Sequence, residues 1–346
     1  ITVAALLPED YDLKLIDMNV QKLKKKDIAG CDIVMISAMI VQSTSFASVV
    51  KMCRDCGVKV AAGGPYPTTS YKQICDVDYF ILNEAEITLP SFIRDFEAGN
   101  PEHVYTTTEK PDITLTPVPR YDLLKIKRYN NLALQNSRGC PFNCEFCDII
   151  ELFGRVPRLK TPAQFASELT AVYETGFRGS VFIVDDNFIG NRSKVISLLQ
   201  EIIKWQKIHK NPFTFFTEAS INLATDDEML GLMNRARFDM VFTGIETPDS
   251  ASLSGCHKTQ NLKTDLLESV KKIQKNGIEV SAGFIVGFDS DKDDIFDRQI
   301  EFIQRSGVSM AMVGLLTALP GTQLYRRLKE EGRLKASVAA SGNNTH

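Results

Sequence analysis

Short apolar runs alternate with amphipathic segments over the first hundred residues. The runs that we expect to form strands are 13–17, 32–38, 58–62 and 77–82. The amphipathic segments that we expect to form helices are 20–28, 45–57 and 86–98. Runs rich in Val and Ile that are separated by helices are typical of a parallel sheet buried on both faces. We therefore predict a doubly wound, Rossmann-like α/β domain over residues 1–100. Residues 1–7 have the pattern of a helix end, so we expect the opening strand of this domain to be missing.

A second series of alternating elements begins near residue 131, after a Pro-containing stretch over 101–130 that we predict to be an extended linker. Its strand candidates are 132–136, 181–185, 213–217, 240–245, 279–286 and 310–317. Six strands separated by helices are too few for a closed eight-stranded barrel. We predict a partial, open (β/α)6 barrel over residues 131–335. Residues 336–346 are small and polar, and we expect them to be disordered.

Composition and charge narrow the range of functions. The 346 residues carry 40 Lys and Arg against 43 Asp and Glu, so no basic excess exists to hold a nucleic-acid backbone. No apolar run is long enough to span a bilayer, and the first residues do not resemble a secretion signal. We expect a cytoplasmic protein, peripheral to a membrane if its substrate is a lipid. The 8 cysteines then indicate thiols available for metal binding more than disulfides.

Three cysteines form the strongest motif of the chain. Cys140, Cys144 and Cys147 have the spacing Cys-x3-Cys-x2-Cys and follow directly on the first strand of the second series. Three thiolates on one short loop can ligate three irons of a cubane cluster and leave the fourth iron open to another ligand. The alternatives are a zinc site and structural cysteines. Zinc normally takes four nitrogen or sulfur ligands, and the nearest downstream Cys or His is His209.

This spacing, with Phe146 before the third cysteine, resembles the radical S-adenosylmethionine (SAM) enzymes over about residues 131–331. The resemblance implies a 4Fe–4S cluster on the three cysteines, SAM chelated to the open iron, and Phe146 near the adenine. One electron from the cluster then cleaves SAM to a 5′-deoxyadenosyl radical. The resemblance also implies SAM contacts at strand ends, from Asp185, Asp186, Glu218, Glu246, Gly283 and Ile285. Solvated strand-end charges and tight strand bends are the alternative interpretation of these positions.

A doubly wound domain before such a barrel resembles the cobalamin-dependent class of this family. Ser37 ends one predicted strand and Gly63-Gly64 ends the next, 26 residues later, close to the spacing of cobalamin-binding folds. A small hydroxyl and a bare backbone leave room there for the nucleotide tail of the corrinoid. No His precedes His103, so no histidine of this domain can reach cobalt. The alternative is a Rossmann-like domain unrelated to cobalamin.

Segments 147–158, 182–188 and 258–261 resemble the branch of this class that contains the hopanoid C-2 methylase. The resemblance implies methyl transfer to an unactivated carbon of a small molecule or lipid, with a flavodoxin- or ferredoxin-type electron donor. One alternative is a radical SAM enzyme that uses cobalamin without methyl transfer, for ring closure or rearrangement. The other is an iron–sulfur or corrinoid sensor without catalysis.

Overall fold

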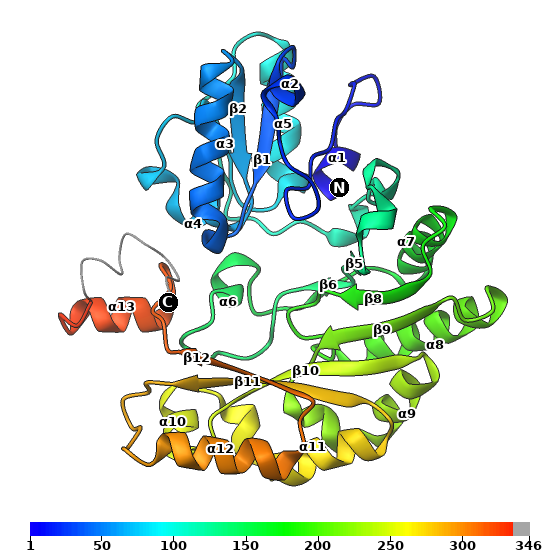
Figure 1. The fold of residues 1–346 in the computed structure, drawn as a ribbon, viewed down its shortest axis with the longest axis vertical. Helices are drawn as coiled ribbons and strands as arrows, with labels where there is room; N and C mark the ends of the chain where they lie inside the picture. The colour runs from blue at the N-terminus through cyan, green and yellow to red at the C-terminus, as the bar shows by residue number, and fades with distance from the viewer. Residues whose placement is uncertain (335–346) are drawn as a thin grey trace. The chain divides into compact units, whose positions relative to one another are not determined.

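The computed structural model describes residues 1–334, and nearly all of them belong to one of two units, Ile1–Arg128 and Tyr129–Glu331 (Figure 1). The predicted disordered tail, 336–346, lies outside the described residues. No helix of the described residues is long and apolar enough to cross a membrane.

The first unit contains a four-stranded parallel sheet in the order β1-β2-β3-β4. The strands are β1 (Ile33–Ser37), β2 (Lys59–Gly63), β3 (Tyr79–Ile81) and β4 (Val104–Tyr105). The helices are α1 (Thr2–Ala5), α2 (Lys25–Ile28), α3 (Ser43–Asp55), α4 (Pro65–Ser70) and α5 (Ala85–Glu97). β4 comes from the segment predicted as a linker, and residues up to Arg128 group with this unit.

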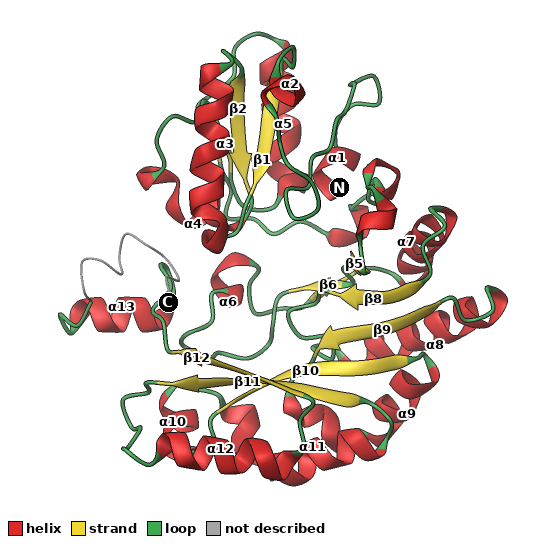
Figure 2. Ribbon diagram, viewed as in Figure 1, coloured by secondary structure: helices red, strands yellow, loops and turns green. Residues whose placement is uncertain are grey.

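Both faces of this sheet are covered by helices, and successive strand residues, which point to opposite faces, pack in two separate apolar clusters. Val60 packs with Phe46 of α3 in one apolar cluster, and Ala61 packs with Phe92 of α5 in another. In Figure 2 these two helices flank the sheet. The predicted α/β class with a parallel sheet is therefore confirmed for this unit.

Two sequence predictions for this unit were wrong. Residues 13–17 pair with no strand of the described residues, although Leu and charged residues alternate there as in a strand. Alternation alone forms no strand, because a strand also needs a partner for its backbone groups. The helix predicted over 20–28 covers only Lys25–Ile28. It begins where Asp27 Oδ2 accepts a hydrogen bond from the Lys24 amide, 3.0 Å away.

The described part of the second unit contains a six-stranded parallel sheet in the order β12-β11-β10-β9-β8-β5. Its strands are β5 (Asn131–Leu134), β8 (Gly179–Ile183), β9 (Phe213–Glu218), β10 (Phe238–Glu246), β11 (Glu279–Val286) and β12 (Met310–Leu315). Its α-helices are α6 (Ile149–Leu152), α7 (Pro162–Glu174), α8 (Arg192–Ile208), α9 (Asp227–Arg235), α10 (Ser250–Gly255), α11 (Leu266–Lys275), α12 (Ile295–Ser306) and α13 (Gln323–Glu330). A short hairpin pairs β6 (Ser137–Arg138) with β7 (Arg158–Leu159). The terminal strands β5 and β12 do not pair with each other, so the predicted open (β/α)6 barrel is confirmed.

The two faces of this sheet differ. Helices α8, α9, α11 and α12 cover one face (Figure 2), where Phe215 and Val241 are fully buried. On the other face Phe182 stacks on Phe216 of the neighbouring strand, with ring centroids 4.6 Å apart and the rings 2° from parallel. Because all six strands run the same way, their carboxyl ends meet at one edge, where ligands of βα folds bind.

We expect Phe215→Ala to lower the free energy of unfolding of the second unit by about 3–5 kcal/mol, because the change leaves a cavity in the sheet–helix core. Trp205, the one Trp of the chain, lies buried in α8 of this unit, so its fluorescence during urea denaturation reports this unit. Met312→Ala is the control, because Met312 is 55% exposed. Equal midpoints for the two variants would contradict the assigned core.

Candidate functional site

The three cysteines of the motif lie on a tight loop that begins directly after β6. Gly139 enters this loop at φ +96°, and a Cβ there would lie 2.9 Å from the carbonyl oxygen of Gly154. The Cys140 amide donates to that same carbonyl, 3.2 Å away. The Cys147 amide donates to the carbonyl of Cys144, also at 3.2 Å. Only glycine fits the entry, and the turn holds the three thiols close together.

The thiols are desolvated and close enough to repel one another when charged. Burial raises the pKa of Cys147 to about 12, and negative charge on Cys144 and Cys140 adds to the shift. Burial also raises the pKa of Cys140, with a further contribution from Cys144. Such thiols ionise readily only when a cation binds them. Among the described residues, no three His, Cys, Asp or Glu side chains converge on the position of a single ion. A cubane cluster instead binds each thiolate at a different iron.

Helix α13, which lies far from the cysteines in the sequence, bonds to the cysteine loop. Arg327 donates to both carboxylate oxygens of Glu145, at 2.8 and 3.1 Å. The Leu324 amide donates to the Glu145 carbonyl at 2.8 Å, and the Glu145 amide donates to the Cys256 carbonyl at 3.0 Å. Every polar group of the Glu145 backbone and side chain is thus bonded, which fixes the loop between its second and third cysteines.

A buried ion pair lies beside the loop. Nζ of Lys258 is 2.5 Å from Oε1 of Glu246, with the side chains 12% and 8% exposed, and 6.0 Å from the centroid of the Phe146 ring. Burial acts to lower the pKa of Lys258, but the Glu246 carboxylate and the Cys144 thiol outweigh it, so the pKa is raised. Glu246 itself has φ +66°, at a register shift between β10 and β11.

Gly244 and Gly283 pair with each other on neighbouring strands, and their lack of a side chain leaves space for the ion pair and for the Phe242 ring. A Cβ on Gly244 would overlap the Glu246 carboxylate and lie 2.7 Å from Nζ of Lys258. Gly283 pairs with Gly244 across the sheet, and a Cβ on it would lie 3.0 Å from the Phe242 ring. Any side chain at either position would force its neighbours to move.

Ile285 follows on the same strand as Gly283 and is half-buried. Its carbonyl oxygen already accepts a hydrogen bond of 2.7 Å from Nε2 of Gln299 in α12. That carbonyl lone pair is therefore used within the protein.

Two neighbouring aspartates at the end of β8 have different surroundings. Asp185 is 1% exposed and accepts four hydrogen bonds of 2.7–3.1 Å from the amides and side chains of Asn136 and Ser137. Its acceptor sites are all used, so Asp185 holds the chain that enters the cysteine loop and offers nothing to a ligand. Asp186 accepts one hydrogen bond, from the Gly139 amide at 2.8 Å, and burial raises its pKa to about 6.

Glu218 ends β9 with its side chain exposed. Partial desolvation by the surrounding protein and the charge of Asp186 raise the pKa of Glu218. No hydrogen bond or ion pair joins its carboxylate to another described residue. Of the predicted strand-end carboxylates, Glu218 is thus the one with both oxygens available.

In the first unit, the ends of β1 and β2 approach each other closely. Ser37 pairs with Gly63, and a Cβ on Gly64, at φ +86°, would lie 2.6 Å from Oγ of Ser37. A Cβ on Gly63 would lie 2.7 Å from the carbonyl oxygen of Ile81. The three predicted cobalamin contacts therefore share one strand-end position with no side chain beyond a hydroxyl.

Contacts and electrostatic interactions link seven of the predicted residues in the second unit: Cys140, Cys144, Cys147, Phe146, Asp186, Glu218 and Glu246. Sequence reasoning did not assign a role to Lys258 or Gly244. The sequence marked Lys258 only through the resemblance of segment 258–261, and that resemblance gave no chemical role. The fold suggests a role because it places Lys258 beside the cysteine loop.

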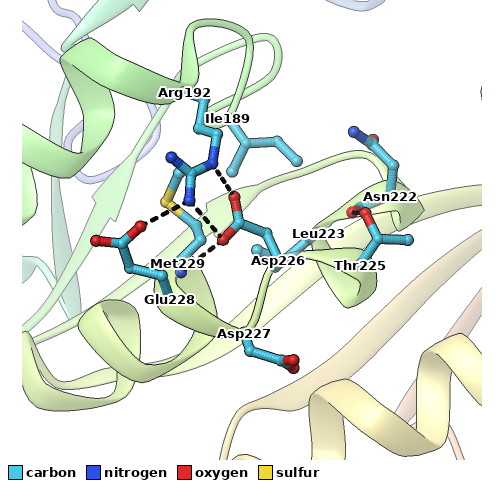
Figure 3. A pocket seen from close by; sticks show the side chains of 9 residues that line it. All are labelled: Ile189, Arg192, Asn222, Leu223, Thr225, Asp226, Asp227, Glu228 and Met229. Carbon is cyan, nitrogen blue, oxygen red and sulfur yellow. Dashed lines mark hydrogen bonds and ion pairs between the residues drawn. The ribbon is translucent and has the colours of Figure 1, made fainter.

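A separate cleft lies between the loops that follow β8 and β9, and it contains none of the predicted site residues (Figure 3). Figure 3 shows the guanidinium of Arg192 between two carboxylates, bonded to Asp226 and, at 2.7 Å, to Glu228. Arg192 already bonds two of the three carboxylates that line the cleft, and no predicted site residue lies there, so this cleft is not the candidate site.

Comparison with known proteins gives a match to one protein family. Residues 136–328 match the model of the Radical SAM superfamily. An uncharacterized methyltransferase of Synechocystis sp. is 46% identical over all of this chain and 65% of its own length. The hopanoid C-2 methylase of Rhodopseudomonas palustris is 38% identical over 96% of this chain and 64% of its own length. The chain thus spans about two thirds of these relatives.

Solved structures share the fold at low sequence identity. The radical SAM methyltransferase TsrM of Kitasatospora setae, with cobalamin and a 4Fe–4S cluster bound, superposes with a TM-score of 0.74 at 14% identity. That match covers 87% of this chain and 67% of TsrM. The cobalamin-dependent SAM radical enzyme OxsB, with aqua-cobalamin bound, gives 0.67 at 18% identity, over 87% of this chain and 53% of OxsB.

We expect Asp185→Asn to lower the free energy of unfolding of the second unit by about 1–3 kcal/mol for each donor left without an acceptor. An amide nitrogen would face donors that now bond to a carboxylate oxygen. Asp239→Asn, at an exposed position of β10, is the matched control and should change stability by less than about 0.5 kcal/mol. Urea denaturation followed by Trp205 fluorescence measures both, and equal stability of the two variants would contradict the role given to Asp185.

Proposed function

Because the chain belongs to the radical SAM superfamily, we propose that Cys140, Cys144 and Cys147 hold a 4Fe–4S cluster. The observation that carries this proposal is the buried turn that brings the three thiols together beside a cation, Lys258. When bound, such a cluster supplies the electron that cleaves SAM to a 5′-deoxyadenosyl radical. The raised thiol pKa values mean that iron must displace protons on binding. The positive charge of Lys258 then offsets part of the negative charge of the thiolates.

SAM would contact the strand ends next to this loop. The free carboxylate of Glu218 suits an ammonium group or a ribose hydroxyl. Asp186 retains acceptor capacity, and Glu246 shares its charge with Lys258. Phe146 presents an aromatic face for adenine, and the bare backbone at Gly283 allows close approach. Asp185 acts in this scheme as a positioning residue for the loop.

The first unit would bind cobalamin at the ends of β1 and β2. Ser37, Gly63 and Gly64 leave a strand-end position that a Cβ would obstruct, as a corrinoid tail requires. The fold that the chain shares with OxsB, which binds aqua-cobalamin, supports the same assignment. No histidine of residues 1–102 is present to ligate cobalt from below.

The overall reaction would be methyl transfer from SAM, by way of cobalamin, to an unactivated carbon. One SAM would supply the methyl group, and a second would supply the radical that removes hydrogen from the substrate. The names of the relatives as methyltransferases support this reaction. The aromatic face formed by Phe182, Phe216 and Phe242 suits an apolar small molecule or lipid. We further propose a flavodoxin- or ferredoxin-type electron donor and a cytoplasmic location, at a membrane surface if the substrate is a lipid.

We expect Cys144→Ala to abolish 5′-deoxyadenosine formation, because two thiolates cannot hold the cluster. Anaerobic reconstitution with iron and sulfide, iron analysis and an assay with dithionite and SAM measure this. Cys256→Ala is the matched control: Cys256 is buried near Cys144 but lies outside the motif. Wild-type activity in Cys144→Ala, or its loss in Cys256→Ala, would overturn the three-thiolate assignment.

We expect label from SAM with a deuterated methyl group to appear in the product when the protein is supplied with cobalamin and a hopanoid. Two SAM molecules should be consumed for each methylated product. Mass spectrometry of product and 5′-deoxyadenosine measures both. An unlabelled product would instead support cobalamin use without methyl transfer, in ring closure or rearrangement.

A further inference from the structure

Gln260 is a buried amide beside the cysteine loop whose presence the proposed SAM and cobalamin contacts do not require. Its side chain is 4% exposed, and Nε2 lies 3.7 Å from Sγ of Cys144. Its Oε1 is buried without a hydrogen-bond partner among the described residues. Buried polar atoms are nearly always paired, so an unpaired one calls for a specific reason. The feature that accounts for this buried side chain is its donor group, Nε2, which faces the sulfur of Cys144.

The short turn that carries Gln260 is fixed on both sides of it. Lys258, two residues before, forms the ion pair with Glu246. Asn261, the next residue, donates from Nδ2 to the carbonyl oxygens of Gly244 and Ile245, both at 3.0 Å. These bonds attach the turn to the end of β10, so the direction of the Gln260 side chain is set by the sheet and not by the cysteine loop.

We propose that Gln260 is a positioning residue that donates an N–H···S hydrogen bond to the Cys144 thiolate and raises the reduction potential of the cluster. The inference rests on the proposed cluster site. Reduction adds one negative charge, and a donor on a ligand sulfur stabilises the more negative state more strongly. The buried surroundings strengthen this bond because little solvent screens it.

The test is the midpoint potential of the reconstituted cluster, measured by redox titration followed by EPR spectroscopy, in wild type and in Gln260→Met. Met has a similar shape and no donor, and it removes the unpaired Oε1 as well. We expect unchanged iron content and a lower potential. Each tenfold loss in the reduction equilibrium corresponds to about 59 mV for one electron. When a weak reductant supplies the electron, Gln260→Met should also cleave SAM more slowly than wild type does.

Gln206→Met is the matched control. Gln206 is 1% exposed and donates to the Phe213 carbonyl at 2.7 Å, away from the cysteine loop. This variant should lose stability without any shift in potential. A wild-type potential in Gln260→Met overturns the inference. If that variant does not load iron, Gln260→Leu, which removes the donor without adding a charge, gives the same comparison, and an unshifted potential there also overturns it. A wild-type protein that binds no cluster would instead overturn the proposed function.

Discussion

The carboxylate of Asp185 is the contact on which the candidate site depends. It satisfies four donors of Asn136 and Ser137, at the point where the chain leaves the first strand of the barrel and turns into the cysteine loop. A buried carboxylate without donors would be very costly, and buried amides without an acceptor would be costly as well. Each side of the contact therefore requires the other. The result is a loop whose entry is fixed relative to the neighbouring strand.

Charge balance is the second constraint on the site. Thiols, carboxylates and a lysine share one buried region, where unpaired charge is unfavourable. Lys258 is paired with Glu246, and its positive charge also acts on Cys144 and Cys147. Glu145 is neutralised by Arg327 from α13. This arrangement leaves the three thiols and the carboxylates of Asp186 and Glu218 as the groups able to accept further positive charge, which suits a metal centre with a cationic ligand.

Glycine positions give the site its space. Gly139 allows the loop entry, and Gly244 leaves room for the Glu246–Lys258 pair. In the first unit, Gly64 permits the close approach of its backbone to Ser37. In each case the obstacle to a side chain is a particular neighbouring atom, so the requirement is steric and local.

The sequence by itself determined the parallel α/β class, the six strands of the open barrel and the cysteine motif. Continuous apolar runs and three cysteines on one short segment are local signals, so they can be recognised without knowledge of the tertiary contacts. Tertiary structure decided the features that depend on a partner. Residues 13–17 alternate like a strand and find no neighbour, whereas β4 is two residues long and exists because β3 lies beside it. Asp185 and Asp186 are adjacent in sequence, yet only the fold shows that one is saturated by donors and the other is not. Lys258 and Gln260 follow Cys147 by more than a hundred residues, and their chemistry emerges only when β10 and the turn after it place them against the sulfur atoms.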